Sequence, residues 1–166
     1  NQKRRKRMIE RSLVLIKPDG VQRGIVGELI TRFEKAGIKI SGLKLVRIDE
    51  GFSKKHYKAH VKKAFYKGLE KMITEGPVLA LVLEGLHCVE VVRKITGPTE
   101  PKTAPPGTIR GDYAHHSYEY TDGKGIAIKN LIHASGTIEE AKEEIALWFS
   151  EEEIFDYKTV HEKHVF

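Results

Sequence analysis

The chain has 166 residues, of which 40 % are hydrophobic and 31 % are charged, and its formal net charge at pH 7 is +6. This composition argues against a membrane protein, because no apolar run approaches the roughly 20 residues that a membrane-spanning helix requires. Residues 1–10 hold five basic side chains against Glu10, a net charge of +4, so residues 11–166 carry only +2 and lack the strong positive charge of a nucleic-acid-binding domain.

The length fits one domain. We expect a basic, flexible tail over residues 1–10, which lacks the apolar stretch of a secretory signal, and then a single domain over residues 11–166. Cys88 is the only cysteine and cannot form an internal disulfide, which favours a reducing, cytoplasmic location.

The first predicted elements alternate between strand and helix. Residues 12–16 are a short apolar run that predicts a buried strand, and the sequence Lys17-Pro18-Asp19-Gly20 predicts a turn at its end. Apolar residues at helical spacing predict an amphipathic helix over residues 25–36. The alternation of apolar and polar residues over 38–48 predicts a second strand with one solvent-exposed face.

The middle of the chain continues this alternation. Residues 53–75 have a helical composition with a break near Ala64, and the apolar run 78–83 predicts a core strand. A helix over residues 88–96 leads into a proline-rich loop over residues 97–110. A last strand is predicted over residues 126–132.

The final predicted helix begins at Thr137, which forms a capping box with Glu140. Its predicted core stripe consists of Ile138, Ala141, Ile145 and Trp148. The complete order of elements predicts an α+β fold of the ferredoxin-like split βαβ type, with a four-stranded antiparallel sheet covered by helices on one side.

His133 is the first candidate for chemistry, since it ends a predicted strand shortly before a capped helix N-terminus, where anions bind favourably. A neutral imidazole is a potential nucleophile. Glu144, two turns into the helix, would accept a proton from the other ring nitrogen, with Ser135 bridging. The alternative is a half-buried structural histidine.

Phosphoryl transfer also requires concentrated positive charge. Lys17, Arg93 and Arg110 are candidates, although each taken singly fits an ordinary surface charge equally well. No Walker-type phosphate-binding loop is present, because Pro101 stands where the second glycine belongs in the nearest approach to one.

Three segments together resemble the signature segments of nucleoside diphosphate kinases, in the family's order. They are Lys17–Gly24, Gly107–Asp112 and Asn130–Ser135, the last of which resembles the family's Asn-x-x-His-x-Ser pattern. The resemblance extends from about residue 11 to residue 157. It implies an enzyme that transfers the γ-phosphoryl group of a nucleoside triphosphate to a nucleoside diphosphate by a ping-pong mechanism and so maintains nucleotide pools.

The resemblance also implies a role for each matching residue. His133 would become phosphorylated, with Glu144 and Ser135 supporting its imidazole and Tyr57 nearby. Lys17 and Asn130 would contact the sugar hydroxyl and adjacent phosphates, and Phe65 would stack on the base beside Leu69. The residues expected to bind the phosphate chain are Arg93, Thr99 and Arg110.

The implied cofactor is Mg²⁺, held mainly by nucleotide phosphates rather than by the protein. The implied partners are ATP, ADP, GTP, GDP and other nucleotides, accepted with broad base specificity, and further copies of the chain in a hexamer or a tetramer built from dimers. The sequence departs from the family pattern in three places, and one of them is Pro98 before Thr99, where an acidic residue is common, which predicts a stiffer loop near the phosphates. Gly136 replaces a usual aspartate, which predicts a looser helix start, and about ten extra residues around 113–125 resemble longer loops of some archaeal members.

Other functions have weaker support. His56 with His60, and a cluster of Asp112, His115, His116 and Glu119, could suggest a metal site, but neither has the spacing of a known motif. A nucleic-acid-binding module would display aromatic side chains on its strands, and residues 12–16 and 78–83 have none. An inactive relative kept for assembly or regulation is the third alternative.

Overall fold

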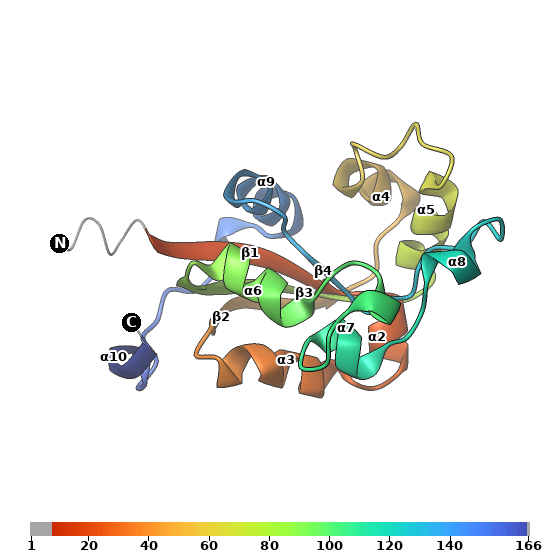
Figure 1. Cartoon of the computed structure of the whole chain (residues 1–166). Coiled ribbons are helices and arrows are strands. Elements are labelled where there is room, and N and C mark those ends of the chain that lie inside the picture. Colours follow the sequence, from red (N-terminus) through yellow and green to blue (C-terminus); the bar gives the residue numbers. More distant parts are fainter. Residues whose placement is uncertain (1–7, 166) are drawn as a thin grey trace.

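The computed structural model describes residues 8–165, so the expected basic tail lies largely outside the described residues. One antiparallel sheet in the order β2-β3-β1-β4 organises the chain, which confirms the predicted α+β class (Figure 1). Its strands are β1 (Ile9–Ile16), β2 (Lys39–Val46), β3 (Val78–Leu86) and β4 (Ile132–Ala134).

Short helices connect and follow the strands, and the predicted break near Ala64 separates two of them. The helices are α2 (Pro18–Gln22), α3 (Val26–Lys35), α4 (Glu50–His56), α5 (Tyr66–Thr74), α6 (Cys88–Thr96), α7 (Ile109–Tyr113), α8 (Tyr118–Thr121), α9 (Ile138–Trp148) and α10 (Glu162–Val165), with 3-10 turns η1 (Pro101–Thr103) and η2 (Glu151–Glu153).

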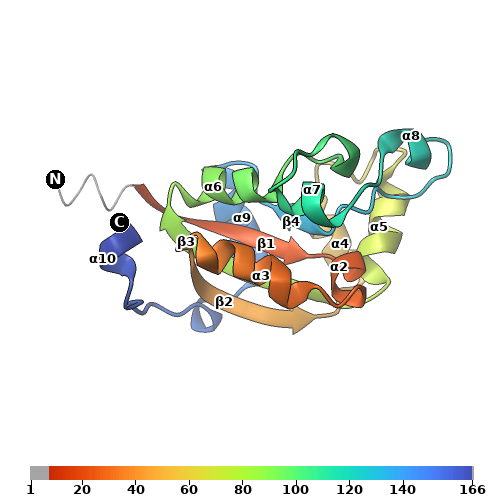
Figure 2. The same cartoon turned by 60° about the horizontal axis from the view of Figure 1, so that its bottom comes forward.

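Helices cover both faces of the sheet, so the prediction of helices on one side was wrong. Val14 and Ile16 of β1 pack with α3 and α6 on one face, whereas Leu13 and Leu15 pack with α5 and α9 on the other. Figures 1 and 2 show α3 and α9 on opposite sides of the strands. The unbroken apolar run in β1 reflects this burial on two faces, because a strand with one wet face alternates instead.

The last strand was also misplaced: β4 begins at Ile132, where the predicted strand was to end. Leu131 has a φ of 72°, a left-handed backbone conformation that an extended strand cannot contain. Two hydrogen bonds hold this residue. Its amide donates to the Asp19 carboxylate at 3.0 Å, and its carbonyl accepts from the Lys17 amide at 2.9 Å.

Helix α9 begins with a modified cap. The Thr137 hydroxyl accepts from the Glu140 amide at 3.1 Å as predicted, but the Glu140 carboxylate accepts from the Gly136 amide at 3.0 Å, so the reciprocal bond of the capping box is displaced by one residue. A Cβ atom at position 136 would lie 2.5 Å from that carboxylate. Glycine therefore makes room for the cap, and the expected looser start is not observed. Ile138, predicted to join the core, is 40 % exposed.

The displaced cap generates a stability prediction. Glu140→Ala should lower the free energy of unfolding by about 1 kcal/mol, because the Gly136 amide loses its acceptor. Thermal unfolding at fixed protein concentration measures the effect. The matched control is Glu139→Ala, which removes a charge from the same turn without removing the cap, and equal losses in the two variants would contradict the assignment.

Candidate active site

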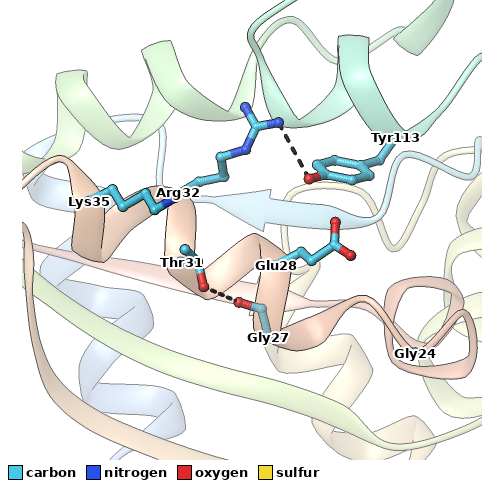
Figure 3. A pocket seen from close by; sticks show the side chains of 7 residues that line it. All are labelled: Gly24, Gly27, Glu28, Thr31, Arg32, Lys35 and Tyr113. Atoms are coloured by element: carbon cyan, nitrogen blue, oxygen red, sulfur yellow. Dashed lines mark hydrogen bonds between the residues drawn. The ribbon is translucent and has the colours of Figure 1, made fainter.

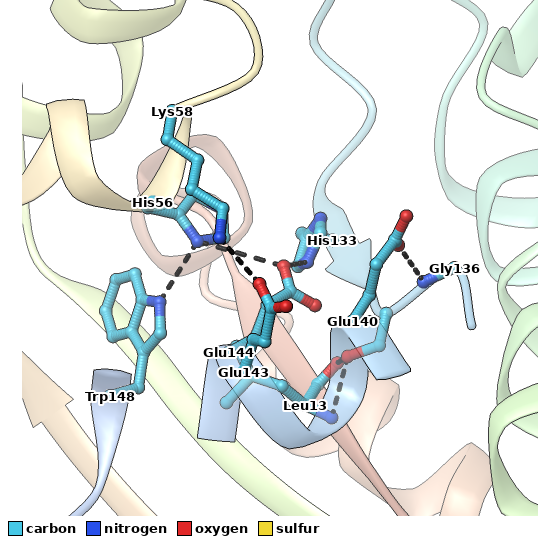
Figure 4. A network of polar contacts seen from close by, with 10 residues as sticks. Leu13, His56, Lys58, His133, Gly136, Glu140, Glu143, Glu144 and Trp148 are labelled. Carbon is cyan, nitrogen blue, oxygen red and sulfur yellow. Dashed lines mark hydrogen bonds and ion pairs between the residues drawn. The ribbon is translucent and has the colours of Figure 1, made fainter. Parts of the chain in front are cut away.

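The imidazole of His133 lies on the sheet face covered by α4, α5 and α9. Strand pairing fixes its position, since His133 stands opposite Leu15 in the β1–β4 ladder. Its Nε2 atom is 2.7 Å from the Glu144 carboxylate of α9 (Figure 4). The Nδ1 atom makes no hydrogen bond to any described residue, and 28 % of the side chain is exposed, so solvent or a ligand can approach it.

Electrostatics keep Glu144 ionised. Burial alone would raise its pKa, but the hydrogen bond and the charge of His133 outweigh burial and lower the pKa. An ionised carboxylate accepts only, so it selects the tautomer of His133 that carries its proton on Nε2 and leaves a lone pair on Nδ1. The predicted pairing of these two residues is therefore formed directly.

Ser135 interacts both with Glu144 of that pair and with the backbone of β1. Its buried hydroxyl accepts from the Leu13 amide at 3.1 Å and donates to the Leu13 carbonyl at 3.3 Å. It also helps to lower the pKa of Glu144, after the larger opposing effect of burial and the effects of His133. The main contribution of Ser135 is to fasten the end of β4 to β1.

His56 and Trp148 were named in the sequence analysis, but neither residue was connected with His133. The Nδ1 atom of His56 accepts a hydrogen bond from the Trp148 indole at 3.1 Å. The rings of His56 and His133 lie edge-to-face, with 4.9 Å between their centroids. Burial, followed by the nearby charge of His133, lowers the pKa of His56 to about 3, so this ring is neutral at pH 7. Tyr57, predicted to lie near the nucleophile, contacts His56 at a ring separation of 4.6 Å.

Lys17 and Asn130 meet at one end of the sheet. The pairing of Ile16 with Ile132 brings their segments together, and the Lys17 ammonium donates to the Asn130 side chain. Asn130 in turn donates to the Thr99 carbonyl at 2.8 Å. Lys17 is only 6 % exposed, and burial lowers its pKa to about 8 even though Asp19 acts in the opposite direction.

Arg110 is buried beside the same segment. Its guanidinium donates to the carbonyls of Gly97, Asn130 and Ile132 at 2.9, 3.2 and 2.5 Å. Burial, followed by repulsion from Arg93, lowers the pKa of Arg110 to about 10, so it remains charged. Arg93 itself is exposed at the end of α6, as is Thr99 in the loop that follows.

The residues expected to hold a base lie at the start of α5. Phe65 is 55 % exposed and is therefore not a core residue, whereas Leu69 packs partly against the core. The extra segment approaches the same helix, because a Cβ atom at Gly68 would lie 3.1 Å from the Gly125 carbonyl.

The loop cluster considered as a metal site does not assemble. Asp112 pairs with Arg32 at 2.5 Å and Glu119 pairs with Lys102 at 3.0 Å, while His116 accepts from the Lys129 amide. A hollow of about 530 Å³ lies beside Arg32 and Tyr113, and none of the predicted site residues line it. Figure 3 shows the side chains that line this hollow. No helix among residues 8–165 has the length and hydropathy needed to span a bilayer.

Sequence comparisons identify one family. A profile described as nucleoside diphosphate kinase matches residues 10–154. The nucleoside diphosphate kinase of Pyrococcus horikoshii is 53 % identical over 148 residues, which cover 89 % of this chain and 90 % of that protein. That of Borreliella burgdorferi is 44 % identical over 156 residues, covering 91 % and 93 % respectively.

Solved structures lead to the same family. The nucleoside-diphosphate kinase from Borrelia burgdorferi, a transition state mimic with bound vanadate and ADP, gives a TM-score of 0.91 at 42 % identity, over 95 % of this chain and 97 % of that one. A halophilic nucleoside diphosphate kinase from Halobacterium salinarum in complex with CDP gives 0.83 at 41 % identity, over 95 % and 98 %. The resemblance carried by three short segments is thus confirmed over most of the sequence, and the chain belongs to the nucleoside diphosphate kinase family.

Proposed function

We propose that the chain carries out its family's reaction through a phosphorylated His133, transferring the γ-phosphoryl group of a nucleoside triphosphate to a nucleoside diphosphate. The observation that carries this proposal is the contact of Nε2 with Glu144, which leaves Nδ1 free and oriented. A nucleophile held by a charged acceptor on its far side is the arrangement that covalent catalysis requires.

The reaction has two steps, the phosphorylation of His133 and the transfer of the phosphoryl group to the acceptor. The Nδ1 lone pair attacks the γ-phosphorus, the bond from phosphorus to the bridging oxygen breaks, and the nucleoside diphosphate leaves with the electron pair. The Glu144 carboxylate stabilises the positive charge that develops on the imidazole, because it accepts the Nε2 proton in a hydrogen bond. A terminal phosphate oxygen of the second diphosphate then attacks the same phosphorus, the bond from phosphorus to Nδ1 breaks, and its electron pair returns to Nδ1, so His133 is regenerated.

Positive charge for both steps comes from the residues around Asn130. Lys17 and Arg110 are buried and fixed by hydrogen bonds before any ligand arrives, so little reorganisation is needed when a phosphate chain binds. The exposed Arg93 and Thr99 would complete the contacts to the phosphates. Lys17 and Asn130 would also reach the sugar hydroxyl, and Tyr57 would flank the nucleophile.

Base recognition through Phe65 and Leu69 would be permissive. Stacking on an aromatic face uses no hydrogen bonds to base edges, so it discriminates weakly between bases. The relatives solved with ADP and with CDP support acceptance of both purine and pyrimidine nucleotides here. ATP, GTP and the corresponding diphosphates are therefore all proposed substrates.

Mg²⁺ is proposed to arrive with the nucleotide. The one group of three potential ligands among residues 8–165 contains two imidazoles, which suit Mg²⁺ poorly. The residues present therefore fit an ion coordinated by phosphate oxygens and water, which would neutralise part of the phosphate charge when bound.

A labelling experiment tests the proposal. The protein is incubated with γ-labelled ATP and Mg²⁺ but without an acceptor, and we expect label that is stable in base and labile in acid, as for a phosphorus–nitrogen bond. Addition of any nucleoside diphosphate should remove it. His133→Ala should carry no label, and His161→Ala, at an exposed position of the carboxyl-terminal segment, is the matched control. Acid-stable label, or label retained by His133→Ala, would refute the assignment.

The pKa of Lys17 predicts how activity depends on pH. Below pH 8 the ammonium is charged, and the charge is lost as the pH rises through about 8, so kcat/KM should fall on the alkaline side. Asp19 raises this pKa; Asp19→Asn should therefore move the fall to lower pH. Rate measurements from pH 6.5 to 9.5 provide the test, and a profile that is the same in both proteins would rule out Lys17 as the titrating group.

We also propose a cytoplasmic homo-oligomer, with a hexamer as the expected form. Strand β2 lies at the edge of the sheet, and its Leu43 and Leu45 are 50 % and 59 % exposed on one face. Light scattering should give a mass several times 18.8 kDa. Replacing both leucines with lysine should reduce it, whereas Val160→Lys, at a site 95 % exposed, should not. A monomeric wild-type protein would disprove the assembly.

A further inference from the structure

We propose that His56, His133 and Glu144 form a binding site for Zn²⁺ or a similar transition-metal cation, which would withdraw His133 from phosphoryl transfer. The three side chains come from α4, β4 and α9, and one potential ligand atom of each lies within 4.8 Å of the others (Figure 4). No other group of three such side chains lies so close together among residues 8–165.

The donor set determines which cation would bind. Two imidazoles and one carboxylate are typical of zinc, and the fourth tetrahedral position would remain open. Zinc–ligand bonds of about 2.0–2.1 Å place ligand atoms roughly 3.3 Å apart. The distances from the Glu144 carboxylate to the two imidazole nitrogens lie on either side of this value. The Oε2 atom of Glu144 is 2.7 Å from Nε2 of His133 and 3.9 Å from Nδ1 of His56. All three ligand atoms lie within 4.8 Å of one another, so side-chain rotations would have to close the wider gaps around the ion.

A second observation also indicates a missing cation. The Oε1 atom of Glu144 is buried and has no hydrogen-bond partner among the described residues. A buried carboxylate oxygen without a partner is costly, because it has lost water and gained nothing in exchange. The oxygen that faces the two rings is Oε2, so a metal ion bound through both carboxylate oxygens would also satisfy Oε1.

Trp148 competes with the metal for the same lone pair. Its indole N–H donates to Nδ1 of His56 at 3.1 Å, and that nitrogen cannot accept the hydrogen bond and bind a cation at once. Metal binding must therefore displace the indole. Since Trp148 is the only tryptophan of the chain, its fluorescence reports this exchange directly.

The effect on His133 follows from the atom that the metal would occupy. A cation on Nε2 needs the lone pair of that nitrogen, so the ring proton moves to Nδ1, which then has no free lone pair for attack on phosphorus. This inhibition rests on the function proposed above, whereas the binding itself does not.

Binding is tested by titrating nucleotide-free protein with zinc chloride while following Trp148 fluorescence. We expect a saturable change at one Zn²⁺ per chain and none with Mg²⁺. His56→Gln should weaken binding at least about tenfold, the scale seen when even an outer partner of a metal ligand is lost. His161→Gln is the matched control and should bind as the wild type does. An unsaturable response, or one unchanged by His56→Gln, would overturn the site.

A second variant, Trp148→Phe, keeps the test decisive if His56→Gln does not fold. Because it removes the competing N–H donor, it should bind Co²⁺ severalfold more tightly than the wild type, as measured by the visible absorption of tetrahedral Co²⁺. Weaker binding would contradict the proposal.

Inhibition is measured as the rate of labelling by γ-labelled ATP. Zinc should slow the wild type at concentrations that leave His56→Gln unaffected, and full labelling of the zinc-bound protein would exclude the blocking role. If no label appears even without zinc, the phosphohistidine is refuted. The fluorescence titration would still decide whether zinc binds.

Discussion

The active site depends on how the backbone at Leu131 is held. A left-handed conformation costs a residue other than glycine roughly 1–2 kcal/mol, and here the residue is also fully buried. Hydrogen bonds to the Asp19 carboxylate and from the Lys17 amide offset that cost. The same two bonds fix the turn after β1 against the segment before β4. They therefore set the relative positions of the Lys17 ammonium, which comes from the turn, and His133, which comes from the strand.

The contacts around Leu131 hold two buried cations, Lys17 and Arg110, at positions that stability alone would not favour. The pKa values of Lys17 and Arg110 are both lowered, chiefly by burial, which means that folding works against their charges. Backbone carbonyls, Asn130 and the Asp19 carboxylate compensate only in part, because burial still lowers both pKa values. Positive charge that remains uncompensated at a fixed site can bind phosphate. The direction of the two pKa shifts shows that this charge opposes folding.

The sequence predicted the elements with strong local signals and missed those set by distant contacts. Helix α3 follows its apolar spacing to within a residue, but β4 was misplaced because no local pattern reveals that Asp19 holds Leu131 in a turn. The site divides in the same way. The local pattern and the motif resemblance together predicted His133 and Glu144, whereas the contact of His56 with Trp148 joins residues 92 positions apart and leaves no trace in either segment.

The extra segment around residues 113–125 has a structural connection to the phosphate-binding residues. Its backbone and side chains bind the loop after α6: the Tyr118 amide donates to Glu100 at 3.0 Å, and Lys102 both donates to the His116 carbonyl and pairs with Glu119. Thr99, next to Glu100, accepts from Asn130. The segment, the loop and Asn130 thus form one connected set of hydrogen bonds. Because a fixed donor needs no reorganisation when negative charge arrives, bracing this loop extends the preorganisation of Lys17 and Arg110 to the exposed side of the site.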